Sequence, residues 1–303
     1  MDLTPALLPA YVGFLREAYP ADDPSISIER VLAEIETGKR VLERTKVLSD
    51  AGGGLLAVIR TEPVDATTWI LTPLKIRPGA DAGMRDECLS LIADAVAYAR
   101  AKGAGKIESR VPVQEMFPEY ARVMRDIGFA RHGGRIEFRT PLEDLPADEG
   151  TPFRWNASTN QSLDESATLI NQAAVGDPDW DPSDDWRSLL KSLLADPYLN
   201  GGPDCVHVGT IDGQTAAVIV SQVAPSDGWS RITYMGLLPA WRGRGLGRWL
   251  HRHGFAMLKA QNGRTYHGGT SADNRTMLAL FRGHGCKEYR SFDVWLWRAE
   301  DAN

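Results

Sequence analysis

The sequence has few of the features that mark whole classes of protein. Only three of its 303 residues are cysteines, Cys88, Cys205 and Cys286, and their spacing is not that of metal ligands. We expect buried thiols in a reducing compartment and no bound metal. No apolar run reaches the length of a membrane span. The short apolar stretch at 7–15 follows no basic residue, so we expect a first helix there and not a signal peptide. Together these absences favour a cytoplasmic protein.

An excess of positive charge is also missing. The chain has 34 Lys and Arg against 40 Asp and Glu, for a formal net charge of −6, and the basic residues form no long run. Because nucleic-acid binding needs a broad basic face, a nucleic acid is not an expected partner. A membrane is not expected either, since no apolar run is long enough to span one. The hydrophobic fraction of 43% and the charged fraction of 24% are those of an ordinary globular protein. The length fits two domains of about 150 residues each.

A polar, proline-rich segment at 141–152 has the composition of a linker. We therefore predict one domain at 1–145 and a second at 152–303. The two halves show the same order of expected elements, which indicates a tandem repeat. In the first half these are a strand at 68–76, a helix at 84–101, a strand at 106–111, a helix at 118–126 and a strand at 134–139. In the second half they are a strand at 230–238, a helix at 246–259, a strand at 264–268, a helix at 274–283 and a strand at 292–297. Ahead of these, the second half shows expected helices at 162–175 and 186–195 and expected strands at 205–210 and 215–223.

The run at 242–248 is the part of the sequence that describes a ligand. Gly243, Gly245 and Gly247 alternate with arginines and a leucine between an expected strand and an expected helix. Glycines allow the backbone to approach an anion closely, and the first amides of a helix point toward it. A Rossmann loop would be followed by an acidic residue about 20 positions on, and 261–269 contains none. A Walker A loop would continue with Lys-Ser or Lys-Thr, which is absent here.

The spacing Arg-x-x-Gly-x-Gly, directly after Leu-Leu-Pro, resembles the acetyl-CoA loop of the GNAT acetyltransferase superfamily. The likeness continues through Asn274 and Gly285 and covers about 230–297. It implies an α/β fold of two tandem GNAT-like domains, each a mostly antiparallel twisted sheet flanked by helices. In overall architecture the chain resembles tandem members such as mycothiol synthase. The residues that the resemblance assigns to acetyl-CoA are Leu237, Leu238, Arg242, Gly243, Arg244, Gly245, Leu246, Gly247, Arg248 and Asn274. Asn274 is also a good helix N-cap, and both roles are compatible.

The catalytic groups are harder to assign. Many members of the family have a tyrosine where this chain has Phe281, and a phenyl ring cannot protonate a departing thiolate. Tyr234, near the expected thioester, and His284, three residues after Phe281, are candidate acids. His267 is a candidate base, ahead of His207, because imidazole has a suitable pKa. A lone histidine on a strand is nevertheless more often structural.

The amino-terminal copy departs from the pattern of a coenzyme site. An alignment without gaps places Asp86 opposite Gly245 and Cys88 opposite Gly247, and Phe117 stands near the position of Asn274. A carboxylate repels a pyrophosphate, and side chains block its close approach. We expect this half to keep the fold, to have lost tight acetyl-CoA binding, and to leave one coenzyme site per chain.

The resemblance implies an N-acetyltransferase that moves an acetyl group from acetyl-CoA to a primary amine of a small molecule by direct attack. The connection at 176–186 holds five aspartates and two tryptophans. It is either a solvated loop that caps a helix or a lid that attracts a cationic amine such as an amino sugar, aminoglycoside or polyamine. Two alternatives remain open: a non-catalytic acyl-CoA-binding or sensor protein, and acetylation of a peptide or protein amine. The oligomeric state is a monomer or a homodimer.

Overall fold

The chain folds into two compact units, which are seen in a computed structural model. The structure describes residues 1–19, 28–80, 85–113, 120–157, 163–178, 185–195, 205–225 and 228–302. Unit 1 comprises 1–133 with 292–303, and unit 2 comprises 134–291. The contacts thus divide the chain at places other than the linker at 141–152. The ranges 1–145 and 152–303 stay a prediction about which pieces fold by themselves.

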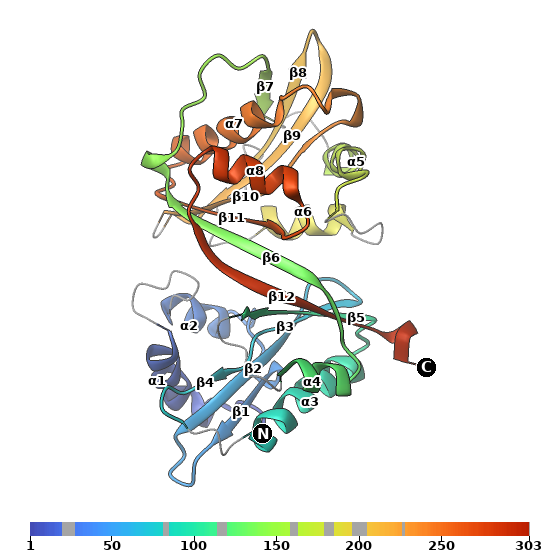
Figure 1. Ribbon diagram of the computed structural model, residues 1–303. Helices are drawn as coiled ribbons and strands as arrows, with labels where there is room; N and C mark the ends of the chain where they lie inside the picture. Colours follow the sequence, from blue (N-terminus) through green and yellow to red (C-terminus); the bar gives the residue numbers. More distant parts are fainter. Residues whose placement is uncertain are drawn as a thin grey trace. The chain divides into compact units, whose positions relative to one another are not determined.

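Unit 1 is a mixed sheet with helices on both faces (Figure 1). Its elements are α1 (Leu8–Ala18), α2 (Ile28–Glu36), β1 (Thr45–Ser49), β2 (Leu55–Pro63), β3 (Thr68–Leu71), β4 (Lys75–Ile76), α3 (Arg85–Ala101), β5 (Lys106–Pro112) and α4 (Tyr120–Asp126). The sheet runs β1-β2-β3-β5, with only β3 and β5 parallel, and β4 pairs with β2. The strand predicted at 68–76 is interrupted at 72–74, where Pro73 has no backbone N–H to donate.

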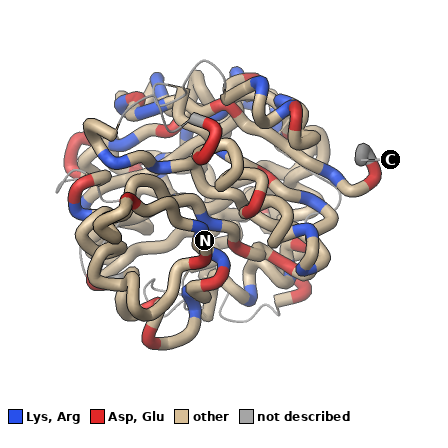
Figure 2. Tube along the Cα trace, turned by 90° about the horizontal axis from the view of Figure 1, so that it is seen from below, with Lys and Arg blue, Asp and Glu red and all other residues tan. Residues whose placement is uncertain are grey.

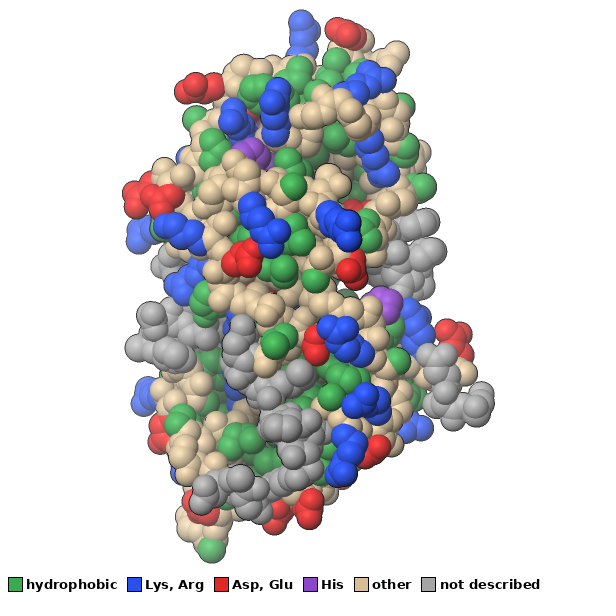
Figure 3. Space-filling view, viewed as in Figure 1, with side chains coloured by type: hydrophobic (Ala, Val, Ile, Leu, Met, Phe, Trp, Pro, Cys, Tyr) green, Lys and Arg blue, Asp and Glu red, His purple; other side chains and the backbone are tan. Residues whose placement is uncertain are grey.

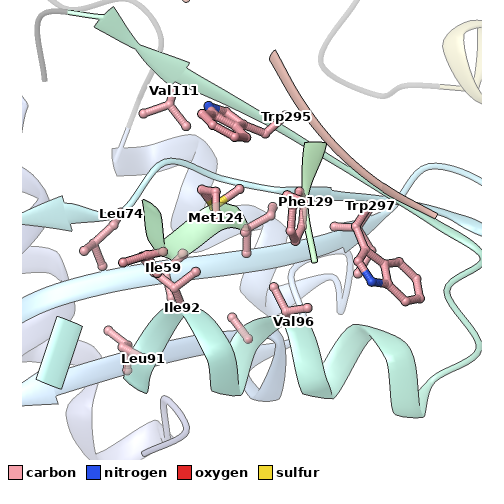
Figure 4. Packing of buried hydrophobic residues seen from close by; sticks show 14 of the residues in the cluster. Ile59, Leu74, Leu91, Ile92, Val96, Val111, Met124, Phe129, Trp295 and Trp297 are labelled. Atoms are coloured by element: carbon pink, nitrogen blue, oxygen red, sulfur yellow. The ribbon is translucent and has the colours of Figure 1, made fainter. Parts of the chain in front are cut away.

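The largest hydrophobic cluster of unit 1 lies between α3 and the sheet. Figure 4 shows Ile92 and Val96 of α3 facing Ile59 of β2, with Trp295 and Trp297 on the other side of the same cluster. Both tryptophans belong to the last strand of the chain. Unit 1 therefore completes its core with residues from the far end of the sequence.

Unit 2 has a sheet in the order β6-β11-β10-β9-β8-β7, in which only β10 and β11 are parallel. Its elements are β6 (Ala130–Pro141), β7 (Arg154–Ala157), α5 (Leu163–Ala174), α6 (Trp186–Leu194), β8 (Val206–Ile211), β9 (Gln214–Val223), β10 (Trp229–Leu237), α7 (Gly247–Ala260), β11 (Thr265–Ser271) and α8 (Arg275–Gly283). The last strand, β12 (Glu288–Arg298), belongs to unit 1 from Phe292 on. The helices α7 and α8 pack on one face, and α5 and α6 pack on the other (Figure 1). The four helices lie within two residues of their predicted bounds.

The last strand of each half is exchanged. Residues 135–141 of β6 pair with β11 in unit 2, and residues 292–298 of β12 pair with β5 in unit 1. Phe138 of β6 stacks on Phe281 of α8, with ring centroids 4.3 Å apart. The tandem α/β fold class is as predicted, but the sequence order of the final strands does not tell which sheet each one joins.

The cysteines, the charges and two searches of the described residues add four observations. All three cysteines are buried thiols. Lys and Arg are interspersed with Asp and Glu along the described trace (Figure 2). Among the helices that the structure describes, none is both long and apolar enough to cross a membrane. Within the same described ranges, no group of three or more His, Cys, Asp or Glu side chains is arranged to hold a metal ion.

Candidate active site

The two parallel strands of unit 2 separate after three paired residues. The ladder joins 229–231 of β10 to 265–267 of β11, and Arg231 opposite His267 is its last pair. Beyond this point β10 continues along β9 to Leu237, while β11 continues along β6 to Ser271. Thr233 is an extra residue in β10, because its neighbours Ile232 and Tyr234 oppose successive residues of β9. The two strands therefore diverge after this pair and leave an opening between them.

One edge of the opening carries main-chain donors. The Leu238 amide donates to the Ala216 carbonyl at 2.9 Å, so Leu238 forms a hydrogen-bonded pair with β9. Because such pairs alternate along an antiparallel ladder, Met235 and Leu237 turn their N–H groups away from β9, toward the opening. The orientation of the Leu237 N–H thus supports a role as donor, whereas the Leu238 N–H already donates to Ala216 of β9. Met235 was missed, since only the register with β9 reveals its orientation.

The glycine-rich loop after β10 has the shape of an anion cradle. Gly243 and Gly245 have φ of 73° and 72°, the left-handed region that favours glycine, and an added Cβ at either would meet no atom within 4 Å. At Gly247 an added Cβ would lie 3.2 Å from Leu280 Cδ1, so this glycine allows α7 and α8 to pack closely. In the described part of the chain, none of the amides at 243–248 donates to a protein acceptor. Consecutive open amides before a helix fit a pyrophosphate.

The three arginines of the loop differ in role. Arg242 donates from Nε to the Leu237 carbonyl at 3.0 Å, and from its two terminal nitrogens to the Val175 and Ala173 carbonyls at 2.6 Å each. Its guanidinium therefore ties the end of α5 to β10, and its contact with the coenzyme stays a prediction. Arg244 and Arg248 are exposed, and each lies over a tryptophan ring, with centroid distances of 5.0 Å. Lys and Arg side chains are also visible on the face of unit 2 that carries α7 and α8 (Figure 3).

Asn274 caps α8 as the sequence suggests. Its Oδ1 accepts from the Met277 amide at 3.1 Å, and its Nδ2 donates to Asp177 Oδ1 at 3.3 Å. The side chain is 6% exposed. Asn274 therefore fixes the start of α8 and links it to the segment after α5, while its contact with the coenzyme stays a prediction.

Phe281 and His284 lie in a buried aromatic cluster between α7, α8 and the sheet. Phe281 is 2% exposed. His284 Nδ1 lies 3.1 Å from Nδ1 of His251, whose Nε2 lies 3.1 Å from the hydroxyl of Tyr266. Burial lowers the pKa of His284, and Arg252 lowers it further, so the neutral imidazole is favoured. This environment is unsuited to the predicted role of His284 as a proton donor. His251, which is fully buried, was missed because nothing in the sequence distinguishes it.

Tyr234 keeps a proton-donor role open. Burial raises the pKa of its phenol, and the nearby Asp177 carboxylate raises it further. Its hydroxyl lies 3.5 Å from the Ile170 carbonyl, and its ring meets Trp186 edge to face at 4.9 Å. A phenol with a raised pKa stays protonated at neutral pH. Tyr234 can therefore serve as an acid and not as a base.

The two strand histidines have different surroundings. His267 lies at the point where β10 and β11 separate, and its ring is 5.4 Å from that of Trp229. Nδ1 of His207, on β8, lies 3.1 Å from Nε2 of His253, and Nδ1 of His253 lies 2.7 Å from Oδ2 of Asp148. Since β9 separates β8 from β10, His207 is part of a structural cluster and not of the opening. His267 remains the candidate base.

Some of the predicted residues lie outside the described ranges, and two others, Asp86 and Cys88, belong to unit 1. Asp179 and Asp181 of the acidic connection are outside the described ranges, and so is Phe117. In unit 1, Asp86 is exposed in the first turn of α3, and Cys88 is buried in the large hydrophobic cluster. A buried thiol and an exposed carboxylate here agree with the expected lack of a phosphate cradle, although coenzyme binding by unit 1 stays a prediction.

Comparisons with known proteins agree with this geometry. Residues 168–286 match the model of the acetyltransferase (GNAT) family. A GCN5-related N-acetyltransferase from Sphaerobacter thermophilus is 17% identical, with a TM-score of 0.72 over 98% of this chain and 94% of that chain. A tandem GNAT protein from the clavulanic acid biosynthesis pathway is 14% identical, with a TM-score of 0.65 over 97% and 95%.

A third solved structure is a glucosamine N-acetyltransferase region in a fungal multi-domain beta-N-acetylglucosaminidase. It is 15% identical, with a TM-score of 0.70 over 98% of this chain and 38% of that one. At these identities the structures show the fold alone. No match was found among curated protein sequences. The family match and the shared fold support acyl transfer as the class of reaction.

Proposed function

We propose that the protein is an acetyl-CoA-dependent N-acetyltransferase that acts on a primary amine of a small molecule. The observation that carries this proposal is the joint presence of open amides at 243–248 and outward N–H groups on the separated edge of β10. An anion cradle at one end of a strand edge suits a ligand with a pyrophosphate and an extended amide-bearing arm. The solved neighbour named for glucosamine acetylation supports a small amine as acceptor.

Acetyl-CoA would supply an activated acetyl group. The amides of 243–248 would bind its pyrophosphate, and Arg244 and Arg248 would add charge. The N–H groups of Met235 and Leu237 would donate hydrogen bonds to the extended arm of the coenzyme and would polarise its acyl carbonyl. Polarising that carbonyl is the role of an oxyanion hole. Tyr234 would hold a proton for the leaving thiolate, and His267 would accept one from the amine. Attack by the amine then depends mainly on its positioning.

A single glycine tests the donor site. We expect Gly245→Asp to raise the Kd for coenzyme A at least about tenfold, because it places a carboxylate at the cradle and a side chain at positive φ. The matched control is Gly213→Asp, in the turn between β8 and β9, which has a φ of 76° and open space around it. Isothermal titration of both variants separates backbone strain from lost binding. Equal affinities in the two variants would contradict the assignment of the loop.

A non-catalytic acyl-CoA-binding protein is the second candidate, and Phe281 favours it. The ring that replaces the family's tyrosine is buried and stacked on Phe138, so it offers no proton. Release of free thiol from acetyl-CoA in the presence of an amine panel decides between the two. Turnover supports the enzyme, whereas coenzyme binding without turnover on any small or peptide amine supports the second candidate.

Three further features belong to the proposal, and two of them have direct measurements. We propose a cytoplasmic protein, a monomer or homodimer, and an architecture like that of mycothiol synthase. Light scattering reports the mass in solution, and fractionation of cells reports the location. The buried thiols agree with a reducing compartment.

A further inference from the structure

A row of basic side chains crosses three strands of unit 2 where the opening begins. Arg231 of β10 is opposite His267 of β11, which is opposite Arg139 of β6. In-register neighbours on adjacent strands share a face of the sheet. The intervening residues of β6 and β11, including Phe138 and Tyr266, pack toward α7 and α8. The basic row therefore projects from the face that α5 and α6 cover.

Arg231 is held in a fixed orientation. Gln222 of β9 is 1% exposed, and its Oε1 accepts from Nε and Nη2 of Arg231 at 3.0 and 2.7 Å and from Oγ1 of Thr233 at 3.0 Å. The Gln222 Nε2 donates to the Leu193 carbonyl of α6 at 3.1 Å. The Arg231 guanidinium also lies over the Trp229 ring, 5.4 Å from its centroid. The buried Gln222 amide thus fixes the partly exposed Arg231 guanidinium. A planar guanidinium held in one orientation is preorganised to bind a carboxylate or phosphate group.

A third arginine, Arg135 of β6, reaches the same opening. An added Cβ at Gly269 would lie 3.1 Å from Nη2 and 3.2 Å from Nε of Arg135, so this guanidinium crosses β11 where a glycine leaves room. Gly269 follows the last pair between β10 and β11. Glu137 is the acidic neighbour on this part of β6, and Arg290 pairs with it at 3.2 Å. Three arginines, Arg231, Arg139 and Arg135, therefore lie on this face beside the opening, with Glu137 on the same strand as two of them.

We propose that the acceptor is an amine that also carries an anionic oxygen group, a carboxylate or a phosphate, bound by Arg231 and Arg139 beside His267. This inference rests on the proposed function. A coenzyme laid along the opening from the loop at 243–248 directs its acyl end toward the bulge at Thr233, next to the basic row. An anionic group on Arg231 would hold the amine of the same molecule near that end. A purely cationic polyamine would be repelled.

Matched pairs of amines test the proposal by turnover. The panel contains α-amino acids with their amides, and amino sugars with their 6-phosphates, assayed by release of free thiol from acetyl-CoA. We expect the anionic member of at least one pair to have a kcat/KM about ten- to hundredfold higher than its neutral partner. Arg231→Gln should remove this preference and leave the KM for acetyl-CoA unchanged, and Arg231→Lys should restore part of it. Turnover that favours neutral or cationic members throughout would overturn the proposal.

Anion binding tests the same residues without turnover. Acetate and inorganic phosphate are titrated at constant ionic strength while tryptophan fluorescence is followed. We expect Arg231→Gln to weaken acetate binding about tenfold or more. The matched control Arg154→Gln removes an exposed arginine of β7 and should bind like the wild type. Phosphate binding that survives in Arg231→Gln belongs to the loop at 243–248.

The two experiments together distinguish a failure of the anion-site proposal from a failure of the enzymatic proposal. Acetate binding that depends on Arg231, with no turnover of any amine, would support the anion site and sink the enzymatic proposal. Turnover of amines together with identical acetate binding in Arg231→Gln, Arg154→Gln and the wild type would support the enzyme and sink the anion site. Carboxylate and phosphate acceptors are distinguished by which pair shows the preference.

Discussion

Arg242 shows how one residue type can serve two purposes within a single loop. Its guanidinium donates to three carbonyl oxygens at the end of α5 and in β10, whereas Arg244 and Arg248 are exposed beside tryptophan rings. The sequence predicts the cradle because alternating glycines and a following helix are local signals. It does not separate the arginines, because the carbonyls at Ala173 and Val175 come from a different part of the chain.

We predict opposite effects for two arginine variants. Arg242→Ala should lower the free energy of unfolding by about 2 kcal/mol, since it leaves three carbonyl groups without their charged donor. Arg244→Ala should leave stability unchanged and weaken coenzyme A binding. Urea unfolding and calorimetric titration of both variants are the measurements. A stable Arg242→Ala protein with lost coenzyme affinity would return Arg242 to the ligand site.

The buried histidines predict how stability depends on pH. Burial lowers the pKa of His251 and of His284 below 6.5, so these imidazoles stay neutral in the folded protein and take up protons when it unfolds. Their contribution is present above about pH 6.5 and is lost as pH falls below it. The wild type should therefore lose stability on acidification in this range. In His284→Gln the proton uptake on unfolding should fall by up to one, measured from urea unfolding at a series of pH values.

Among the elements, helices were easier to predict than the partners of strands. The bounds of α5 to α8 followed from apolar periodicity and from end signals such as Asn274 and Gly285. The break between β3 and β4 was missed although Pro73 marks it. The basic row could not be predicted, because Arg231, His267 and Arg139 come from three distant segments and become neighbours only through strand register. The acceptor site was therefore the part of the function that the sequence indicated least.

Gly269 of β11 allows the acceptor side of the opening to be tested separately from coenzyme binding. Gly269→Ala should push the Arg135 guanidinium aside by a few tenths of an ångström, because the new Cβ would lie 3.1 Å from its Nη2. We expect a lower kcat/KM for the acceptor with unchanged coenzyme A affinity. Gly283→Ala at the end of α8 is the control, since an added Cβ meets no atom within 4 Å there, and it should be neutral or slightly stabilising. Indistinguishable kinetics in the two variants would argue against a role for Arg135.

For the whole molecule, the exchange of final strands decides which pieces of the chain are complete. A fragment of 134–291 contains every strand of its own sheet as well as Phe138, the partner of Phe281. A fragment of 152–303 lacks β6 and leaves an edge of β11 bare. We predict cooperative unfolding for the first fragment and aggregation or a loose state for the second. Circular dichroism and urea titration compare them, and a cooperative 152–303 fragment would confirm the linker-based domain ranges instead.

The same exchange orders events during synthesis. Residues 1–133 leave the ribosome early, yet the edge of β5 that faces away from β3 has no partner until 292–298 are made. An unpaired strand edge must therefore wait through the translation of most of the protein, when it is most open to association with other chains. Loss of residues 292–298 would then harm the half that was made first.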